Sequence, residues 1–351
     1  MKILHIIFSM NIGGAETMLV DILNQQVKYN HTLELIIINN EYNTKLLETI
    51  DPRVKIKCFN RKKGSKNIIP ILKYNCYISN SKADILHFHE HTAIECLFIK
   101  KHHRVLTIHD VSIPIKKPID CDIVCSISNA VKNDLYNRLG IDSTLVYNGI
   151  NFEDIKISQG DKITNTTNTI RILQISRLDH LKKGQDILIK AISTIKKQYP
   201  LYDISLDLIG DGESLPYLQK LVSENNLDKT VNFLGTKDRK YVYSHLCEYD
   251  ILVQPSIYEG FGLTVVEGLA AKIPVLVSDI DGPMEIIEKG KYGYFFRSGD
   301  TEDCAAKIIQ IINSPDLTTS VVEAYDYAKQ NFSIQNTAKR YLQLYNEVLS
   351  K

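Results

Sequence analysis

The chain has 351 residues, of which 44% are hydrophobic and 24% are charged, and its formal net charge is +1. This composition is ordinary for a globular protein, and at roughly 100–200 residues per domain the length predicts two domains. The balanced charge argues against a nucleic-acid-binding class, and no stretch approaches the ~20 apolar residues of a membrane span. Seven cysteines without a Cys-x-x-Cys pair indicate reduced thiols in a cytosolic protein rather than disulfides or a zinc site.

Short apolar runs alternate with helical segments through the first part of the chain. The first run, Lys2 to Phe8, precedes Gly13-Gly14 and a helical segment at Thr17 to Asn24, an order typical of a doubly wound domain. Gly13 and Gly14 would let a phosphate or sugar approach the backbone, although a tight turn explains them about as well. They do not form the Gly-x-Gly-x-x-Gly fingerprint, which disfavours a nicotinamide enzyme. Further strands are predicted at 33–38, 54–58, 85–88, 105–108 and 123–127.

Histidines gather after two of these predicted strands. His87, His89 and His91 follow one strand, and His109 follows another, directly before Asp110. At the carboxyl edge of a parallel sheet, His109 could hydrogen-bond to a phosphate or a sugar hydroxyl, and a histidine satisfied by neighbouring backbone is the alternative. The His-x-His pairs could bind a metal, but nothing nearby supplies a third and fourth ligand at conventional spacing, so no metal site is predicted.

Basic residues are concentrated around the third predicted strand. A solvated loop is the simpler interpretation, and the functional alternative is a patch that contacts anionic lipid headgroups or a phosphorylated acceptor. These residues are Arg53, Lys55, Lys57, Arg61, Lys62, Lys63 and Lys66.

The second half of the chain repeats the strand and helix alternation. Residues 156–169 are rich in Asn, Thr, Asp and Lys and predict a linker between a first domain at 1–155 and a second at 170–335. Two doubly wound α/β domains would face one another across a cleft at their carboxyl edges. Strands of the second domain are predicted at 170–175, 204–209, 231–234, 251–253, 275–277 and 294–296.

Two loops of the second domain carry candidate site residues. Arg177 and Lys183 follow the strand at 170–175, and a planar guanidinium and an ammonium group can converge on a diphosphate. Surface cations flanking a turn are the alternative. Both residues belong to the carboxyl edge, where ligands of such sheets gather.

Glu259 and Glu267 lie in a Gly-rich turn and in the helix that follows it. Gly260 and Gly262 leave backbone N–H groups unshielded at the helix start, where an anion or a hydroxyl-rich ligand could bind. However, Thr264 to Glu267 also matches the Ser/Thr-x-x-Glu capping box, so Glu267 could simply close the helix end.

Taken in order, these motifs closely resemble the GT-B glycosyltransferases of the retaining, nucleotide-sugar-dependent family 4 (glycosyl transferases group 1). The resemblance spans essentially the whole chain, and the Glu-x7-Glu element is its most specific part. The matching motifs are Gly13-Gly14-Ala15-Glu16, Thr107-Ile108-His109-Asp110, Tyr147-Asn148-Gly149-Ile150, Ser176-Arg177-Leu178 with Lys183-Gly184, Leu208-Ile209-Gly210-Asp211-Gly212, Phe233-Leu234-Gly235, Pro255-Ser256, and Glu259-Gly260-Phe261-Gly262-Leu263 with Glu267.

The resemblance implies a role for each candidate residue. Arg177 and Lys183 would hold the donor diphosphate and stabilise the charge that develops on it, with Lys182 as the alternative to Lys183. The other implied roles are donor-sugar binding by Glu259 with the backbone of Gly260, Phe261, Gly262 and Leu263, ribose binding by Glu267, an approach to the base by Leu234 and Gly235, an approach to the phosphates by Gly13 and Gly14, and contact of His109 with the transferred sugar.

The implied activity is a retaining hexosyltransferase that needs neither a metal nor another cofactor. It would move a sugar from a nucleotide-sugar donor, expected to be UDP-linked, to a hydroxyl of a polysaccharide or lipid-linked glycan, as in capsule or lipopolysaccharide synthesis. The expected location is the cytoplasm or the inner face of the membrane, and the C-terminal helix at 336–351 is expected to cross back to the acceptor-binding first domain. The alternatives are a GT-B sugar-nucleotide epimerase, a phosphorylase, or a catalytically silent nucleotide-sugar-binding protein.

Overall fold

A computed structural model describes residues 1–99, 102–115, 120–158 and 169–350. The chain forms two compact units, one built from 1–150 with the residues from Phe332 onward, the other from 151–331. In the predicted linker, the Lys156 N–H donates to the Tyr243 carbonyl at 3.0 Å, so this end of the segment packs on the second unit. The remainder of that linker, residues 159–168, lies outside the described residues.

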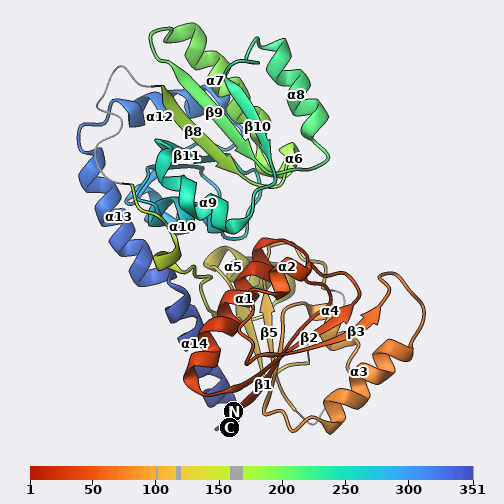
Figure 1. Cartoon of the computed structure of the whole chain (residues 1–351). Helices are drawn as coiled ribbons and strands as arrows, with labels where there is room; N and C mark the ends of the chain where they lie inside the picture. The colour runs from red at the N-terminus through yellow and green to blue at the C-terminus, as the bar shows by residue number, and fades with distance from the viewer. Residues whose placement is uncertain (100–101, 116–119, 159–168, 351) are drawn as a thin grey trace. The chain divides into compact units, whose positions relative to one another are not determined.

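The first unit is built on a parallel sheet of seven strands in the order β3-β2-β1-β4-β5-β6-β7 (Figure 1). The strands predicted from apolar runs are confirmed, because strands of a parallel sheet are covered on both faces and read as continuous hydrophobic runs. The exception is β7, which is too short to leave such a run. The strands are β1 (Lys2–Ile7), β2 (Thr32–Asn39), β3 (Lys55–Arg61), β4 (Ile85–Phe88), β5 (His103–Ile108), β6 (Ile123–Ser126) and β7 (Thr144–Leu145).

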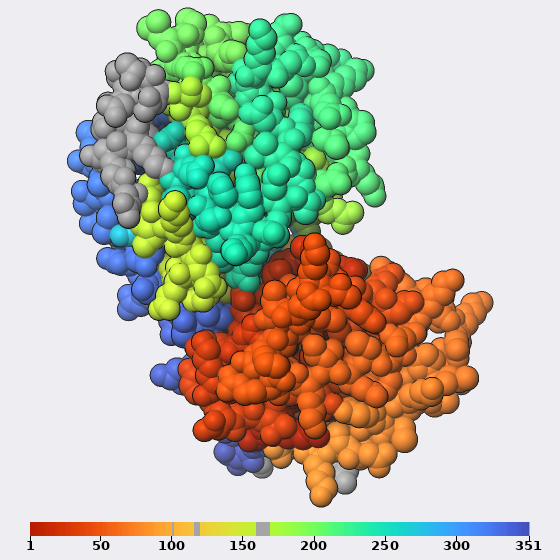
Figure 2. All heavy atoms as spheres, in the orientation of Figure 1, coloured from red at the N-terminus to blue at the C-terminus, as the bar shows by residue number. Residues whose placement is uncertain are grey.

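The C-terminal helix of the chain belongs to this first unit. The Ile150 N–H donates to the Phe332 carbonyl and the Ile334 N–H to the Ile150 carbonyl, both at 2.9 Å, and the helix then packs beside α1 (Figure 1). Helices of the unit are α1 (Gly14–Gln26), η1 (Val27–Tyr29), α2 (Thr44–Leu47), α3 (Ile69–Asn80), α4 (His91–Glu95), α5 (Asn129–Leu139) and α14 (Ile334–Leu349). Helix α3 and the edge strand β3, both orange in Figure 2, lie at the surface of this unit.

The second unit has a parallel sheet of six strands in the order β10-β9-β8-β11-β12-β13. Its core is formed by side chains such as Leu206, Val253 and Ile192, each fully buried, and burying one such side chain stabilises the fold by about 1.5–3 kcal/mol. The strands are β8 (Ile170–Ile175), β9 (Ile204–Ile209), β10 (Val231–Gly235), β11 (Ile251–Gln254), β12 (Val275–Ser278) and β13 (Tyr294–Phe296).

Helices follow most strands of this second sheet, as right-handed parallel crossovers require. They are η2 (Phe152–Asp154), α6 (His180–Lys183), α7 (Gln185–Gln198), α8 (Leu215–Glu224), α9 (Arg239–His245), η3 (Leu246–Glu248), α10 (Leu263–Ala270), α11 (Asp281–Ile286), η4 (Glu288–Gly290), α12 (Thr301–Ile312) and α13 (Leu317–Phe332). Among the described helices, none combines the length and the apolar character needed to cross a bilayer.

Strand order reverses once in each sheet, between β1 and β4 in the first unit and between β8 and β11 in the second. At such a reversal the loops leaving the two neighbouring strands run in opposite directions and open a crevice at the carboxyl edge, where ligands of these folds bind. The predicted residues Arg177, Lys183 and Glu259 all follow β8 or β11. The fold therefore brings residues far apart in sequence to one edge of one sheet.

Candidate active site

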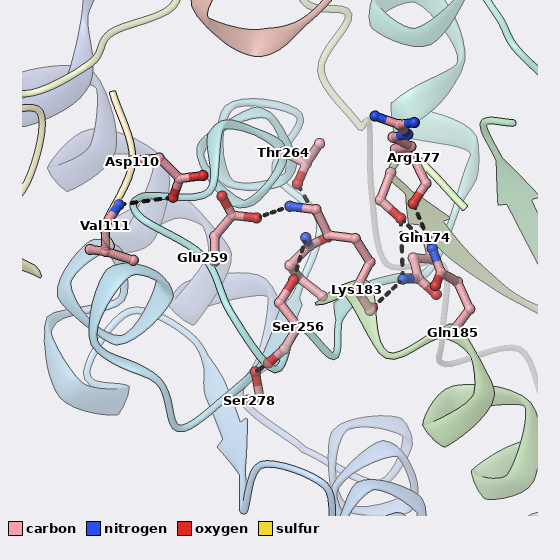
Figure 3. A network of polar contacts seen from close by, with 12 residues as sticks. Asp110, Val111, Gln174, Arg177, Lys183, Gln185, Ser256, Glu259, Thr264 and Ser278 are labelled. Atoms are coloured by element: carbon pink, nitrogen blue, oxygen red, sulfur yellow. Dashed lines mark hydrogen bonds and ion pairs between the residues drawn. The ribbon is translucent and has the colours of Figure 1, made fainter. Parts of the chain in front are cut away.

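The loop after β8 is held by two buried glutamines. Gln174 Nε2 donates to the carbonyl of Lys183 at 3.0 Å, and Gln185 Nε2 donates to the carbonyl of Arg177 at 2.9 Å (Figure 3). The loop ends at Gly184, which has a φ of 63°, and a Cβ at this position would lie 2.0 Å from the carbonyl oxygen of Pro255. Only glycine therefore lets the loop after β8 pack this closely on the loop after β11.

Lys183 forms an ion pair with Glu259 across these two loops (Figure 3). Both side chains are 17% exposed, so the pair is shielded from most of the solvent. In this partly buried place each charge offsets the cost of burying the other. The neighbouring Lys182 instead places its Nζ over the ring of Tyr258, 4.7 Å from the centroid. Of the two candidate lysines, Lys183 is thus the one that faces Glu259.

Arg177 is exposed at the same edge, and its guanidinium extends away from the hydrogen bonds of its own loop (Figure 3). Within the part of the chain that the structure describes, its side chain makes no hydrogen bond or ion pair. A guanidinium has five N–H donors in a planar fork, which matches the geometry of a phosphate.

The turn after β11 ends at Gly262, which has a φ of 110° and is the N-cap of α10. The capping-box interpretation of Thr264 and Glu267 is wrong, because the helix begins before Thr264. The Thr264 hydroxyl instead donates to Gln254 Oε1 at 3.3 Å. Glu267 Oε1 instead accepts from the Tyr243 hydroxyl at 3.2 Å. The N-cap of α10 is a glycine, so its own side chain cannot close the start of this helix.

The other residues predicted for donor binding lie in the same unit. Phe261 is 1% exposed and anchors the Gly-rich turn between Gly260 and Leu263. Leu234 and Gly235 end β10, where the Gly235 carbonyl accepts from the Gly210 N–H at 3.0 Å. The loop after β10 is therefore tied to the loop after β9, at the carboxyl edge of the sheet.

The first unit holds the remaining predicted residues. Gly13 is the N-cap of α1, Gly14 is its first residue, and a Cβ on Gly13 would lie 2.5 Å from the Glu16 carboxylate. His109 follows β5 and stacks on His89 with ring centroids 5.4 Å apart. Burial lowers the pKa of His109 to about 4, so the ring is neutral at physiological pH.

A pocket of about 280 Å³ lies beside His109, within the first unit. Glu90 has its pKa raised to about 7, by burial first and then by the negative charge of Glu16. Burial also raises the pKa of Glu16. Burial thus favours the neutral form of both carboxyl groups, and no lysine or arginine is among the described lining residues, which are Ile7, Ala15, Glu16, His89, Glu90, His91, Thr92, Thr107, Ile108, His109 and Ile113.

The sequence interpretation missed His5, which joins His87 and His89 in a buried cluster whose ligand atoms lie within 4.8 Å of one another. His5 is 82 residues from His87 and so is not a ligand at conventional spacing; it comes beside His87 because β1 pairs with β4. Spacing along the chain gives no sign of this contact. Each ring nitrogen of the cluster already has a hydrogen-bond partner in the protein, so the cluster needs no ion to satisfy its polar atoms.

Two parallel sheets with a strand reversal in each, and charged loops at the carboxyl edge of the second, define the GT-B class of glycosyltransferase fold. HepE of Anabaena, solved in complex with UDP and glucose, superposes with a TM-score of 0.81 and 22% sequence identity, covering 99% of each chain. A glycosyltransferase from Rickettsia africae superposes equally well, with a TM-score of 0.81 and 22% identity over 99% of this chain and 98% of that one.

The family follows from the sequence itself. Residues 157–330 match the model described as Glycosyl transferases group 1, and residues 12–154 match the model described as Glycosyltransferase Family 4. Because the two matches together cover most of the chain, it belongs to glycosyltransferase family 4.

Curated relatives match about two thirds of the chain. An uncharacterized glycosyltransferase of Methanocaldococcus jannaschii is 30% identical over 64% of this chain and 59% of its own length. The N-acetyl-alpha-D-glucosaminyl L-malate synthase of Bacillus anthracis is 26% identical over 65% of this chain and 60% of its own. A poly(ribitol-phosphate) alpha-N-acetylglucosaminyltransferase of Staphylococcus aureus is 25% identical over 64% of this chain and 43% of its own. The matched part thus spans about half the length of these relatives.

Proposed function

We propose that this glycosyltransferase transfers a hexose or N-acetylhexosamine from a UDP-sugar to a hydroxyl of a glycan, polysaccharide or lipid-linked acceptor, with retention of the anomeric configuration. The observation that carries the proposal is the Lys183–Glu259 ion pair at the strand reversal of the second unit, with the exposed Arg177 on the same loop as Lys183. A diphosphate that binds there meets two cations, and the sugar attached to it meets a carboxylate.

The relatives support this choice of donor. HepE was solved with UDP and glucose, and the relatives from Bacillus anthracis and Staphylococcus aureus both carry N-acetylglucosaminyl in their names. UDP-glucose and UDP-N-acetylglucosamine are therefore the first donors to test.

In the proposed reaction the bond from the sugar C1 to the diphosphate oxygen breaks, and Arg177 and Lys183 stabilise the negative charge that develops on the leaving UDP. The acceptor hydroxyl oxygen bonds to C1 on the same face, and its proton passes to the departing diphosphate. Glu259, already held by Lys183, binds hydroxyls of the donor sugar rather than attacking C1. Arg177 and Lys183 supply the positive charge that a metal ion provides in other transferases, so we propose a metal-independent reaction.

We expect the purified protein to hydrolyse one member of a panel of nucleotide sugars slowly in the absence of acceptor. Arg177→Ala and Lys183→Ala should each slow this turnover by about tenfold or more, which is about 1.4 kcal/mol of transition-state stabilisation. Release of UDP measures the rate, and proton NMR of the product of a transfer reaction gives its anomeric configuration.

Lys190→Ala is the matched control, because Lys190 pairs with Asp186 on the exposed side of α7 and should turn over like the wild type. Undiminished turnover in both Arg177→Ala and Lys183→Ala would overturn the assignment of the diphosphate site. An inverted product would overturn retention alone and leave the donor site standing.

We also propose that the first unit contacts an anionic bilayer through a surface that we name the α3 patch, formed by Ile68, Ile69, Leu72 and Phe98. These side chains are 50% to 67% exposed, and the Phe98 N–H donates to Asn75 Oδ1 on α3 at 2.7 Å, so Phe98 lies beside the helix. The preceding loop adds three exposed lysines, and basic residues near an anionic membrane contribute about 1 kcal/mol each. These lysines are Lys62, Lys63 and Lys66.

The protein should co-sediment with vesicles that contain phosphatidylglycerol and not with vesicles of phosphatidylcholine alone. Replacing Leu72 and Phe98 together by serine should weaken the binding by about tenfold, because apolar burial and charge act together at such surfaces. Leu201→Ser is the control, since Leu201 is 97% exposed in the other unit. Equal binding to both vesicle types, or an unchanged double variant, would exclude this surface.

A further inference from the structure

Three imidazoles, of which those of His5 and His89 are buried, form a hydrogen-bonded chain in the first unit, from Gln26 on α1 to His109. His5 Nε2 lies 2.9 Å from Gln26 Oε1, and His5 Nδ1 lies 3.0 Å from His89 Nε2. His89 Nδ1 then lies 3.2 Å from His109 Nε2. Gln26 and His5 are completely buried and His89 is 4% exposed, so water does not interrupt the chain.

The chain fixes where each proton lies. Burial lowers the pKa of His5 and of His109 to about 4 and that of His89 well below its ordinary value, so all three rings are neutral and each has one N–H and one lone pair. Since Gln26 Oε1 only accepts, His5 carries its proton on Nε2 and accepts at Nδ1. His89 Nε2 therefore donates to His5 Nδ1, and His109 Nε2 donates to His89 Nδ1. Both rings thus carry their proton on Nε2.

The other end of the Gln26 amide contacts a hydroxyl and leads to a second chain. Gln26 Nε2 donates to the Tyr345 hydroxyl at 3.5 Å, and that hydroxyl lies 2.6 Å from His87 Nδ1. His87 Nε2 lies 2.8 Å from Thr107 Oγ1, so a second chain runs from the same amide. Turning the amide over would reverse the protons in both chains, which makes Gln26 the residue that sets their direction.

His109 Nδ1 ends the first chain without a hydrogen-bond partner among the described residues, and it is shielded from water. In the tautomer that Gln26 imposes, this atom is an unpaired acceptor rather than an unpaired N–H donor. Orphaned buried N–H groups are the rarer of the two in folded proteins, which favours the same tautomer. The ring lines the pocket of about 280 Å³ together with Glu16 and Glu90.

We propose that Gln26, His5 and His89 are positioning residues that hold His109 protonated at Nε2, so that its Nδ1 accepts a hydrogen bond from a hydroxyl of a sugar bound in this pocket of the first unit. The identity of that hydroxyl donor rests on the proposed function, whereas the tautomer is a property of the protein alone. A metal ion bound by His5, His87 and His89 is the competing interpretation, and it would have to replace hydrogen bonds that every ring nitrogen of these residues already makes.

Nitrogen NMR of the protein labelled with 15N-histidine measures the tautomer without any substrate. At neutral pH we expect His109 to be neutral with a protonated Nε2 and a bare Nδ1, its signals being assigned by their loss in His109→Gln. A protonated Nδ1, a charged ring, or a cluster shifted by stoichiometric Zn²⁺ would each overturn the proposal. Because no turnover is needed, failure of the proposed function cannot be mistaken for failure of this one.

Gln26→Met removes both hydrogen bonds of the amide and should leave His109 as a mixture of tautomers, with kcat about tenfold lower at an unchanged KM for the UDP-sugar. Gln26→Glu should restore the wild-type tautomer, because a carboxylate also accepts from His5 Nε2. The matched control is Gln25→Met on the same helix, since Gln25 accepts from Lys28 Nζ at 2.9 Å and does not touch the chain. A Gln26→Met variant that folds and keeps the wild-type tautomer would overturn the role of Gln26. If that variant does not fold, the nitrogen spectrum of the wild-type protein still decides which nitrogen of His109 is protonated.

Discussion

Adjacent residues of α6 show what sequence reasoning could not decide at the residue scale. Lys182 and Lys183 are equally good phosphate ligands by type, and their order relative to Gly184 does not say which one faces the turn after β11. The short helix places neighbouring side chains about 100° apart, because 3.6 residues make one turn. Lys183 consequently pairs with Glu259, while Lys182 lies over Tyr258.

Glu90 carries a testable consequence of its burial. Its pKa rises from the ordinary value of 4.5 to about 7, by burial first and then by the charge of Glu16. The folded protein therefore keeps a proton that the unfolded chain loses as the pH rises from about 4.5 to 7. Stability that Glu90 contributes is complete below this window, decreases through it and is lost above it.

Glu90→Gln should therefore be as stable as the wild type at the acidic end of this window and more stable above pH 7, since the amide stays neutral. The free energy of unfolding in urea, measured for both proteins across the window, gives the difference. Glu95→Gln is the control, because Glu95 lies exposed at the end of the same helix, α4. A difference between wild type and Glu90→Gln that does not grow with pH would contradict the account of this carboxyl group.

At the scale of elements, the strands were predictable and the contacts between them were not. Apolar runs such as 251–253 and 275–277 mark buried parallel strands, and the structure confirms them as β11 and β12. The start of α10 was not predictable, because the Thr264 capping box and the Gly262 N-cap are both compatible with the sequence. The contact of His5 with His89 depends on β1 pairing with β4, which only the sheet order reveals.

At the scale of the whole molecule, the chain completes the second unit and then returns to the first. The sequence prediction placed the domain limits at 155 and 335, whereas the compact units divide at 150 and 331. Ile150 and Ser333 form a parallel bridge at this point, and such a long-range pair of residues leaves no periodic signal in the sequence. The residues proposed for the donor, from Arg177 to Glu267, all belong to the unit of 151–331, and His109 belongs to the other.

Calorimetric titration of the full chain with UDP tests the donor site most directly. We expect UDP to bind at least tenfold more tightly than UMP, because the second phosphate should contact Arg177 and Lys183, and we expect Lys183→Ala to remove that advantage, about 1.4 kcal/mol. Lys182→Ala should keep it. Equal affinities for UDP and UMP in the wild type, or a loss in Lys182→Ala but not in Lys183→Ala, would contradict the diphosphate site described above.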